Sequence, residues 1–294
     1  MRRASVTEKE IQGTPSLLWP TQVVRAAGPE DHTSAIVLEE PLSVEVNGQR
    51  VAVLMRLPGN EKELGVGFCV SEGILADFES VLTVHHCGRS LPDPIGSSED
   101  QAESRNRVQI RAHPETVRFD AQSDVVRLIR TGCGTVDVAE MADDLPRLNS
   151  DFRVPAERLL DLNAAMREAQ DLYKVSGGVH AAALFDADGR LITLQEDIGR
   201  HNAIDKAIGY CLLRGISLQD RILVATGRAS HDMVTKSVRV GIPIIVSVSA
   251  ATALAAQIAE DRGATLIGYL RGGRMSVYTH PWRIENRTSR IESS

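Results

Sequence analysis

A single thiol between two glycines is the clearest candidate for chemistry in this chain. Residues 131–134 read Thr-Gly-Cys-Gly and follow an apolar run that is typical of a strand. Glycine lets the backbone turn sharply and leaves the sulfur of Cys133 uncrowded. A persulfide carrier needs such a thiol, because a donor and then an acceptor must reach it. An ordinary cysteine in a tight turn is the alternative, since exposure and thiolate character decide reactivity.

Polar side chains crowd one predicted strand-to-helix junction. Residues 196–202 read Glu-Asp-Ile-Gly-Arg-His-Asn. Free N–H groups at a helix start attract anions, and Arg200 and His201 would reinforce that attraction. Glu196 or Asp197 would instead hydrogen-bond a ribose or a base edge. A helix cap with a salt bridge is the alternative, but the density of polar groups favours a functional site.

Three further glycine junctions flank predicted strands. Two glycines precede His180, residues 226–230 read Thr-Gly-Arg-Ala-Ser, and residues 271–274 read Arg-Gly-Gly-Arg. Glycine turns present backbone amides to phosphate, and guanidinium groups bind oxyanions through two hydrogen bonds. Taken singly, they also fit an ordinary loop, a core histidine and a solvated basic turn. Several such junctions at the ends of strands in one sheet predict a common cleft.

The elements that position these residues form two main parts. The sequence predicts a loosely ordered arm over residues 1–30, a β-rich subdomain with one helix over 31–120, an α/β domain over 121–284 and a tail over 285–294. Asn47-Gly48 between two apolar runs predicts a β-hairpin. Residues 61–75 predict a helix, and 107–112 predict an edge or half-buried strand.

The α/β part shows alternating strand and helix patterns. Pro155 suits the first turn of a helix that extends to about residue 173, and Gly263 suits the end of another. Between residues 179 and 279, apolar strand patterns alternate with helical ones. This alternation predicts a largely parallel sheet covered on both faces.

Composition excludes several classes of protein. The 294 residues carry a formal net charge of -6, which is unfavourable for binding nucleic acid. No apolar run approaches the roughly 20 residues of a membrane span, and the first thirty residues lack a signal-peptide core. The four cysteines are far apart and form no CxxC pair: Cys69, Cys87, Cys133 and Cys211. We expect reduced thiols in the cytoplasm, without a disulfide framework or a zinc site.

Ten stretches together resemble the formate dehydrogenase accessory sulfurtransferase family, FdhD. They span about residues 33–284, and the runs 196–206 and 271–281 are the most specific. The ten stretches are 55–60, 63–68, 71–74, the Cys133 loop, 177–185, 196–206, 226–230, Met233, 241–243 and 271–281.

The resemblance implies a sulfur carrier. It would take persulfide sulfur from a cysteine desulfurase and pass it to the molybdenum bis-guanine-dinucleotide cofactor that formate dehydrogenase, or another molybdoenzyme, needs. It also implies a cytidine-deaminase-like α/β/α core with a mixed, largely parallel sheet, a homodimer, and GDP as an analogue of half of the cofactor. The catalytic residue would be Cys133, with no metal ligands. The expected cofactor contacts are Gly178, His180, Glu196, Asp197, Arg200, His201, Asn202, Arg228, Ser230, Tyr269, Leu270, Arg271, Gly272, Gly273 and Arg274.

One position departs from the family pattern. The family loop usually reads C-G-x-C-G, whereas residues 133–137 read Cys-Gly-Thr-Val-Asp, so Val136 replaces the second cysteine. Transfer of one sulfur from Cys133 needs only one thiol. The missing group is a neighbouring thiol that would resolve the persulfide as a disulfide.

Two other functions compete with the carrier. One is a non-catalytic chaperone that binds the cofactor or a guanine nucleotide, with Cys133 incidental. The other is a nucleoside deaminase, which needs H-x-E and P-C-x-x-C zinc motifs. Alanines follow His180 and no P-C-x-x-C exists, so the deaminase is set aside.

Overall fold

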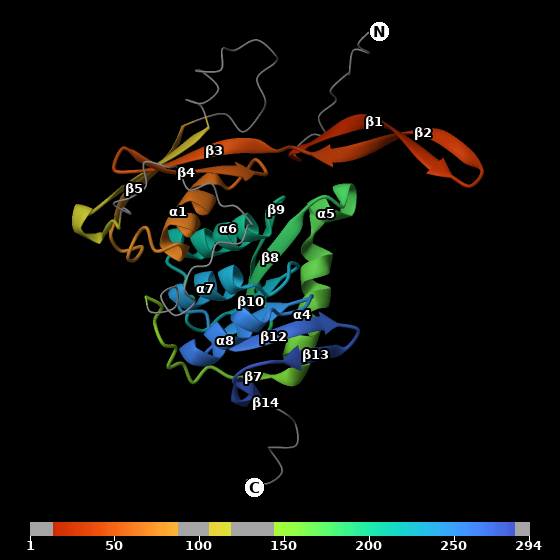
Figure 1. The fold of residues 1–294 in the computed structure, drawn as a ribbon. Coiled ribbons are helices and arrows are strands. Elements are labelled where there is room, and N and C mark those ends of the chain that lie inside the picture. Colours follow the sequence, from red (N-terminus) through yellow and green to blue (C-terminus); the bar gives the residue numbers. More distant parts are fainter. Residues whose placement is uncertain (1–13, 88–105, 119–143, 286–294) are drawn as a thin grey trace.

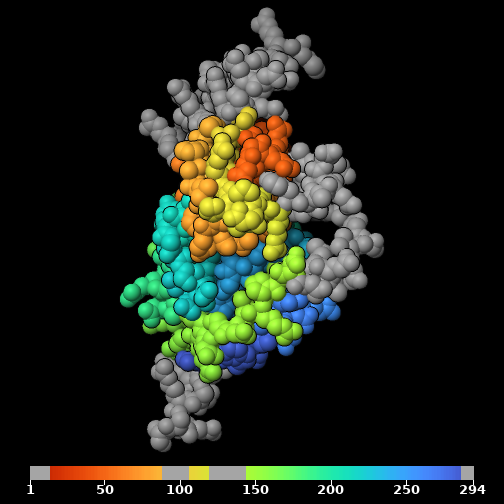
Figure 2. All heavy atoms as spheres, turned by 90° about the vertical axis from the view of Figure 1, so that its left-hand side faces the viewer, coloured from red at the N-terminus to blue at the C-terminus, as the bar shows by residue number. Residues whose placement is uncertain are grey.

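The computed structural model describes residues 14–87, 106–118 and 144–285 and consists of two packed parts (Figure 1). The N-terminal part is a four-stranded sheet with one helix, and the C-terminal part is a six-stranded sheet with helices on both faces. The orange and yellow atoms of the first part lie directly on the cyan and blue atoms of the second (Figure 2). Cys133, Val136 and the strand predicted over 125–129 lie outside the described residues.

The six-stranded sheet has the order β13-β12-β11-β10-β8-β9. Its strands are β8 (His180–Phe185), β9 (Leu191–Asp197), β10 (Ile222–Ala225), β11 (Ile244–Ser247), β12 (Thr265–Arg271) and β13 (Arg274–Val277). Its helices are α4 (Ala156–Ala169), α5 (Asp171–Ser176), α6 (Arg200–Leu213), α7 (His231–Arg239) and α8 (Ala253–Arg262).

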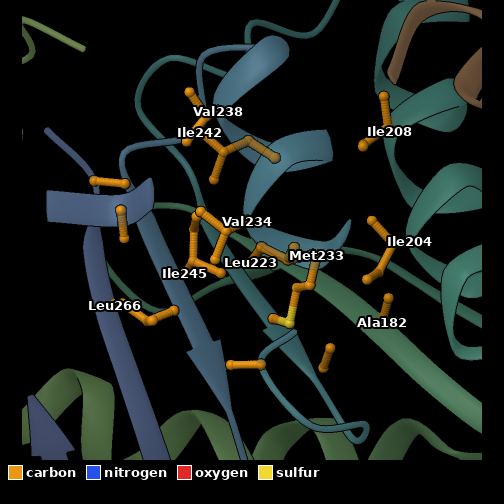
Figure 3. Packing of buried hydrophobic residues seen from close by; sticks show 14 of the residues in the cluster. Ala182, Ile204, Ile208, Leu223, Met233, Val234, Val238, Ile242, Ile245 and Leu266 are labelled. Atoms are coloured by element: carbon orange, nitrogen blue, oxygen red, sulfur yellow. The ribbon is translucent and has the colours of Figure 1, made fainter. Parts of the chain in front are cut away.

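Alternating side chains of this sheet pack into two separate cores. On one face, Leu223, Ile245 and Leu266 pack against α6, α7 and α8 (Figure 3). On the other face, neighbours such as Val224 and Val246 pack against α4. The period of two along each strand therefore produces an α/β/α sandwich.

The sheet is mixed, as predicted, and four of its strands run in the same direction, but antiparallel pairs are more numerous than the prediction of a largely parallel sheet implies. β10 pairs with β11 and β11 with β12 in parallel, but β8 pairs antiparallel with both β9 and β10, and β13 pairs antiparallel with β12. Helices separate the strands only from α6 to β12. At the two ends of the sheet, the β8–β9 and β12–β13 pairs are joined without a helix and are therefore antiparallel.

The N-terminal sheet has the order β4-β3-β6-β5 and packs on α1 (Glu61–Ser71). Its strands are β3 (Glu40–Val46), β4 (Gln49–Arg56), β5 (Val81–Cys87) and β6 (Arg107–Ala112). The Asn47-Gly48 hairpin is confirmed, with both residues at positive φ. β6 is half-buried as predicted, but it lies between β3 and β5 rather than at an edge.

Glycines join the two parts where α1 crosses α6. A Cβ on Gly67 would lie 1.8 Å from the carbonyl oxygen of Asp205, and one on Gly209 would lie 1.9 Å from that of Glu63. Real side chains cannot approach so closely, so only glycine allows the two helix backbones to touch. The two parts therefore pack backbone against backbone at this helix crossing.

A long hairpin corrects the prediction of a loosely ordered arm. β1 (Ser16–Arg25) and β2 (Gly28–Val37) pair antiparallel over their whole length and project from the body (Figure 1). Pro20 and the polar composition argued against order, but the structure places this ribbon without neighbouring strands, where proline is tolerated.

The helix predicted from Pro155 to residue 173 is interrupted. Gln170, with φ -79° and ψ 80°, separates α4 from α5. The remaining elements are η1 (Pro114–Thr116), η2 (Pro281–Arg283) and the paired β7 (Val154–Pro155) and β14 (Ile284–Glu285). Within the described ranges, no helix combines the length and apolarity that crossing a membrane requires.

Candidate functional site

The predicted glycine junctions converge on one edge of the six-stranded sheet. β9, β10, β11 and β12 run in the same direction, and β8 runs against them. The start of β8 therefore meets the ends of the other four strands. This places His180, Asp197, Thr226 and Arg271 along the same edge, although they are far apart in the sequence.

A cavity of about 700 Å³ opens at this edge, between the strand ends and helices α4 and α5. Three of the predicted residues line it: Gly178, His180 and Arg271. Its size falls in the range of small-molecule sites. Its other lining residues are Asn163, Met166, Arg167, Gln170, Tyr173, Gly177, Val179, Ile198, Thr226 and Val248.

His180 is fixed within the cavity wall rather than in the core. Its Nδ1 lies 3.2 Å from Oγ1 of Thr226, the first residue after β10. Burial lowers the pKa of His180, and the charge of Arg200 lowers it further. A neutral imidazole at pH 7 follows, so the arginines supply the positive charge at this edge.

Arg200 and His201 lie beside one another at the start of α6. Nε of Arg200 donates to Nε2 of His201 at 3.1 Å, so the neutral ring carries its proton on Nδ1. Burial lowers the pKa of His201 to about 4, and Asp232 only partly offsets this effect. The Arg200 side chain lies on Gly227, where a Cβ would be 2.8 Å from its Cδ. The absence of a side chain at Gly227 therefore leaves room for the Arg200 side chain beside the end of β10.

Asp197 and Asn202 have internal roles, whereas the sequence predicted ligand contacts. The Asp197 carboxylate is fully buried and lies 2.8 Å from Nζ of Lys206. It also accepts from the backbone of Leu57 and Gly199 and from the side chain of Asn202. Asn202 donates in addition to the carbonyl of Met55. These groups hold the segment after β4 against α6, so their hydrogen-bonding capacity is used within the protein.

Glu196 positions one cavity wall instead of facing a ligand. Its carboxylate oxygens accept from the backbone N–H groups of Leu172 and Tyr173, each at 2.9 Å. This satisfies free donors in the first turn of α5. The carboxylate thereby fixes Tyr173 beside the cavity.

The turn between β12 and β13 presents two arginines. Gly272 and Gly273 both have positive φ and form a two-residue turn, which makes Arg271 and Arg274 direct cross-strand partners. Like charges directly opposite each other are unfavourable, so this pair favours an anion between or beside them. The Arg271 guanidinium also lies 5.3 Å from the ring centre of Tyr269.

Three further predicted residues have different surroundings. Leu270 is buried in the core beneath α4, so its side chain does not face the edge. Arg228 is exposed after β10. Ser230 precedes α7, and its Oγ is buried with no hydrogen-bond partner among the described residues.

Sequence reasoning missed the wall formed by α4 and α5. Asn163, Arg167, Gln170 and Tyr173 all line the cavity. A signal for Gln170 was present, because it follows the buried Met166 by four residues and therefore lies on the apolar face of the helix pattern.

The described cysteines differ in accessibility. Cys69 and Cys211 are buried, and burial raises the pKa of Cys69 strongly and that of Cys211 to about 11. Cys87 is exposed at the end of β5. Cys69 and Cys211 therefore lack both the exposure and the low pKa that a reactive thiol needs.

Comparisons with known proteins identify relatives along nearly the whole chain. The model of the FdhD/NarQ family matches residues 37–285. The sulfur carrier protein FdhD of Thermoplasma acidophilum is 38% identical over 269 residues, which cover 89% of this chain and 90% of the relative. That of Streptomyces avermitilis is 34% identical over 277 residues, covering 90% and 94%.

A solved structure has the same fold. The crystal structure of a candidate formate dehydrogenase accessory protein from Desulfotalea psychrophila superposes with a TM-score of 0.71 at 27% identity. The match covers 92% of this chain and 99% of that one. The sequence motifs, the fold and these relatives agree: the chain belongs to the FdhD/NarQ family.

Proposed function

We propose that this protein is a cytoplasmic sulfur carrier for formate dehydrogenase. It receives persulfide sulfur from a cysteine desulfurase on Cys133 and passes it to the molybdenum bis-guanine-dinucleotide cofactor, which is its substrate. The sulfur-carrier names of its relatives support this function. The observation that carries the proposal is the cavity at the sheet edge, where family motifs distant in sequence meet.

The first step exchanges one S–S bond for another. The Cys133 thiolate attacks the outer sulfur of the desulfurase persulfide, whose cysteine leaves as a thiolate. In delivery, the outer sulfur leaves Cys133 and becomes sulfide by taking two electrons from a reduced molybdenum centre. Cys133 returns as a thiolate, so no second cysteine enters the step. Val136 is therefore compatible with transfer.

The cavity suits a guanine-nucleotide half of the substrate. Arg271 and Arg274 offer guanidinium groups for the diphosphate, and Gln170 is one of the residues that line the cavity. The three-layer core, with an antiparallel β8–β9 pair leading into parallel strands, supports the further proposal of a cytidine-deaminase-like fold. A homodimer stays a prediction.

The Cys133→Ala variant separates the carrier from the chaperone. We expect it to bind GDP like the wild type but to lose activation of formate dehydrogenase. Activation of cofactor-containing, sulfur-free enzyme would be measured with desulfurase and cysteine present. If Cys133→Ala activates the enzyme as well as the wild type does, the protein acts as a chaperone and Cys133 is incidental.

Val136→Cys restores the usual family spacing and should shorten the life of the persulfide. An added thiol three residues away attacks intramolecularly, at an effective concentration far above that of a free thiol. Attack on the Cys133 sulfur forms a disulfide and releases sulfide. Persulfide half-life would be followed by mass spectrometry, with Val136→Ser as the matched control. The single-thiol mechanism fails if activation requires Val136→Cys and the wild type gives none.

A further inference from the structure

An exposed apolar surface lies where the β1–β2 ribbon passes α5 and extends beyond it (Figure 1). Among the described residues, eleven large apolar side chains are exposed, and these three short elements carry five of them. The five define the ribbon–α5 surface: Trp19, Val24 and Ile36 on the ribbon, and Tyr173 and Val175 on α5. Such a concentration is typical of an interaction surface, whereas scattered apolar residues need no explanation.

One face of the ribbon is packed on the body at its base and is uncovered toward its tip. At the base, Val37 packs against the buried cluster that includes Leu172, and its cross-strand partner Ser16 is fully buried. Near the tip, Val24 and its cross-strand partner Pro29 belong to the same face, because side chains alternate along each strand, and both are exposed. The apolar character of this face therefore continues beyond the part that the body covers.

The ribbon is poorly supported by its own contacts. A two-stranded hairpin by itself is marginally stable in water, and β1 and β2 form a sheet of their own. Trp19 and Ile36 are exposed on the face opposite to that of Val24. A projecting ribbon with apolar side chains on both faces fits a groove in a partner protein, because a groove covers both faces at once.

The position of the ribbon–α5 surface indicates which partner covers it. Tyr173 belongs to this surface and also lines the cavity at the sheet edge, where its backbone N–H donates to Glu196. A protein that covers the ribbon and α5 therefore also lies beside the cavity. The molybdoenzyme is the partner that must come to the cavity, because its cofactor is the proposed substrate there.

The tip of the ribbon adds a preference for positive charge. Arg25 pairs with Glu30, whereas the Asp31 carboxylate accepts from the side-chain amide of Gln22 and pairs with no cation of the described chain. Asp31 is exposed. A carboxylate without a cation on an apolar surface is complementary to a Lys or Arg side chain of a partner.

We infer that the ribbon–α5 surface is the docking surface for the molybdoenzyme, and that the ribbon enters an apolar groove of that enzyme bordered by a basic side chain that faces Asp31. The inference rests on the proposed function and deepens it, because it assigns the surface through which the carrier contacts the enzyme that it serves.

The test measures the binding of purified, sulfur-free formate dehydrogenase to the immobilised full-length protein by biolayer interferometry. The surface variant is Val24→Ser/Val175→Ser, whose side chains are 74% and 50% exposed and do not line the cavity. Leu82→Ser is the matched control, because this side chain is 57% exposed on β5 of the N-terminal sheet. Asp31→Lys reverses the charge and leaves the apolar side chains in place, so it decides the test if thermal unfolding shows the double variant to be unfolded.

We expect the double variant to bind the enzyme roughly tenfold more weakly than the wild type, and Leu82→Ser to bind it equally well. Asp31→Lys should also weaken binding, and its effect should shrink as the salt concentration rises. Sulfur loading of Cys133 by a cysteine desulfurase should be the same in all four proteins. Failure of loading in the wild type would therefore concern the proposed function and not this surface.

Three results would show that the inference is wrong. The first is wild-type affinity for the enzyme in either the double variant or Asp31→Lys, and the second is a wild type that does not bind the enzyme. The third is a double variant that changes only desulfurase-dependent loading or only self-association in analytical ultracentrifugation. That result would assign the surface to the sulfur donor or to a second copy of the chain.

Discussion

Replacement of Lys206 by Met is expected to lower the free energy of unfolding by about 3–5 kcal/mol. The ammonium and the Asp197 carboxylate are 1% and 0% exposed and lie 2.8 Å apart. Nζ also donates to the carbonyl of Leu57 at 2.9 Å. Loss of the ammonium leaves a buried carboxylate without its cation and a buried carbonyl without its donor. The three hydrogen bonds that Asp197 keeps do not replace the lost charge.

A matched variant distinguishes the effect of losing a buried lysine from the effect of losing an exposed one. Lys174 pairs with Asp171 at 3.3 Å, but its side chain is 52% exposed, so Lys174→Met should change the free energy of unfolding by less than about 1 kcal/mol. Urea denaturation of both variants and the wild type provides the comparison. Equal losses for the two variants would show that the Asp197–Lys206 pair does not hold the two parts together.

The Asp197–Lys206 pair also shows which features the sequence could indicate and which it could not. The polar run 196–202 correctly marked a strand-to-helix junction, because its residue types are unusual for such a place. Sequence alone did not separate residues that face the cavity from residues that face inward. The Asp197 carboxylate accepts a hydrogen bond from the backbone of Leu57, which follows a strand of the N-terminal sheet. No local pattern reveals a contact between residues 140 positions apart.

The fold was predictable where a local rule dominates. Asn47-Gly48 specified its hairpin, and Gly263 ended α8 in the left-handed conformation. The β1–β2 ribbon was missed because its strands carry proline and many polar residues, which resemble a disordered segment. The contact of Gly67 with α6 was equally invisible, since a helical glycine gives no indication of its distant partner.

Cys133 is expected to be the only cysteine that accepts sulfane sulfur. Cys69 and Cys211 are buried, and their raised pKa values keep them protonated at neutral pH. A protonated thiol is a poor nucleophile, and a buried one is out of reach of a partner protein. Cys87 is exposed and is therefore the internal competitor. Cys87 ends a strand and has a glycine on one side only, Gly88, whereas Cys133 stands between Gly132 and Gly134.

Peptide mapping by mass spectrometry after incubation with a cysteine desulfurase and cysteine tests the carrier function most directly. Cys87→Ser serves as the control that removes the exposed competitor, and Cys133→Ser removes the proposed acceptor. The carrier function predicts one added sulfur atom on the peptide containing Cys133 in the wild type and in Cys87→Ser, and none in Cys133→Ser. Sulfur on Cys69, Cys87 or Cys211, or an unmodified Cys133 peptide, would contradict it.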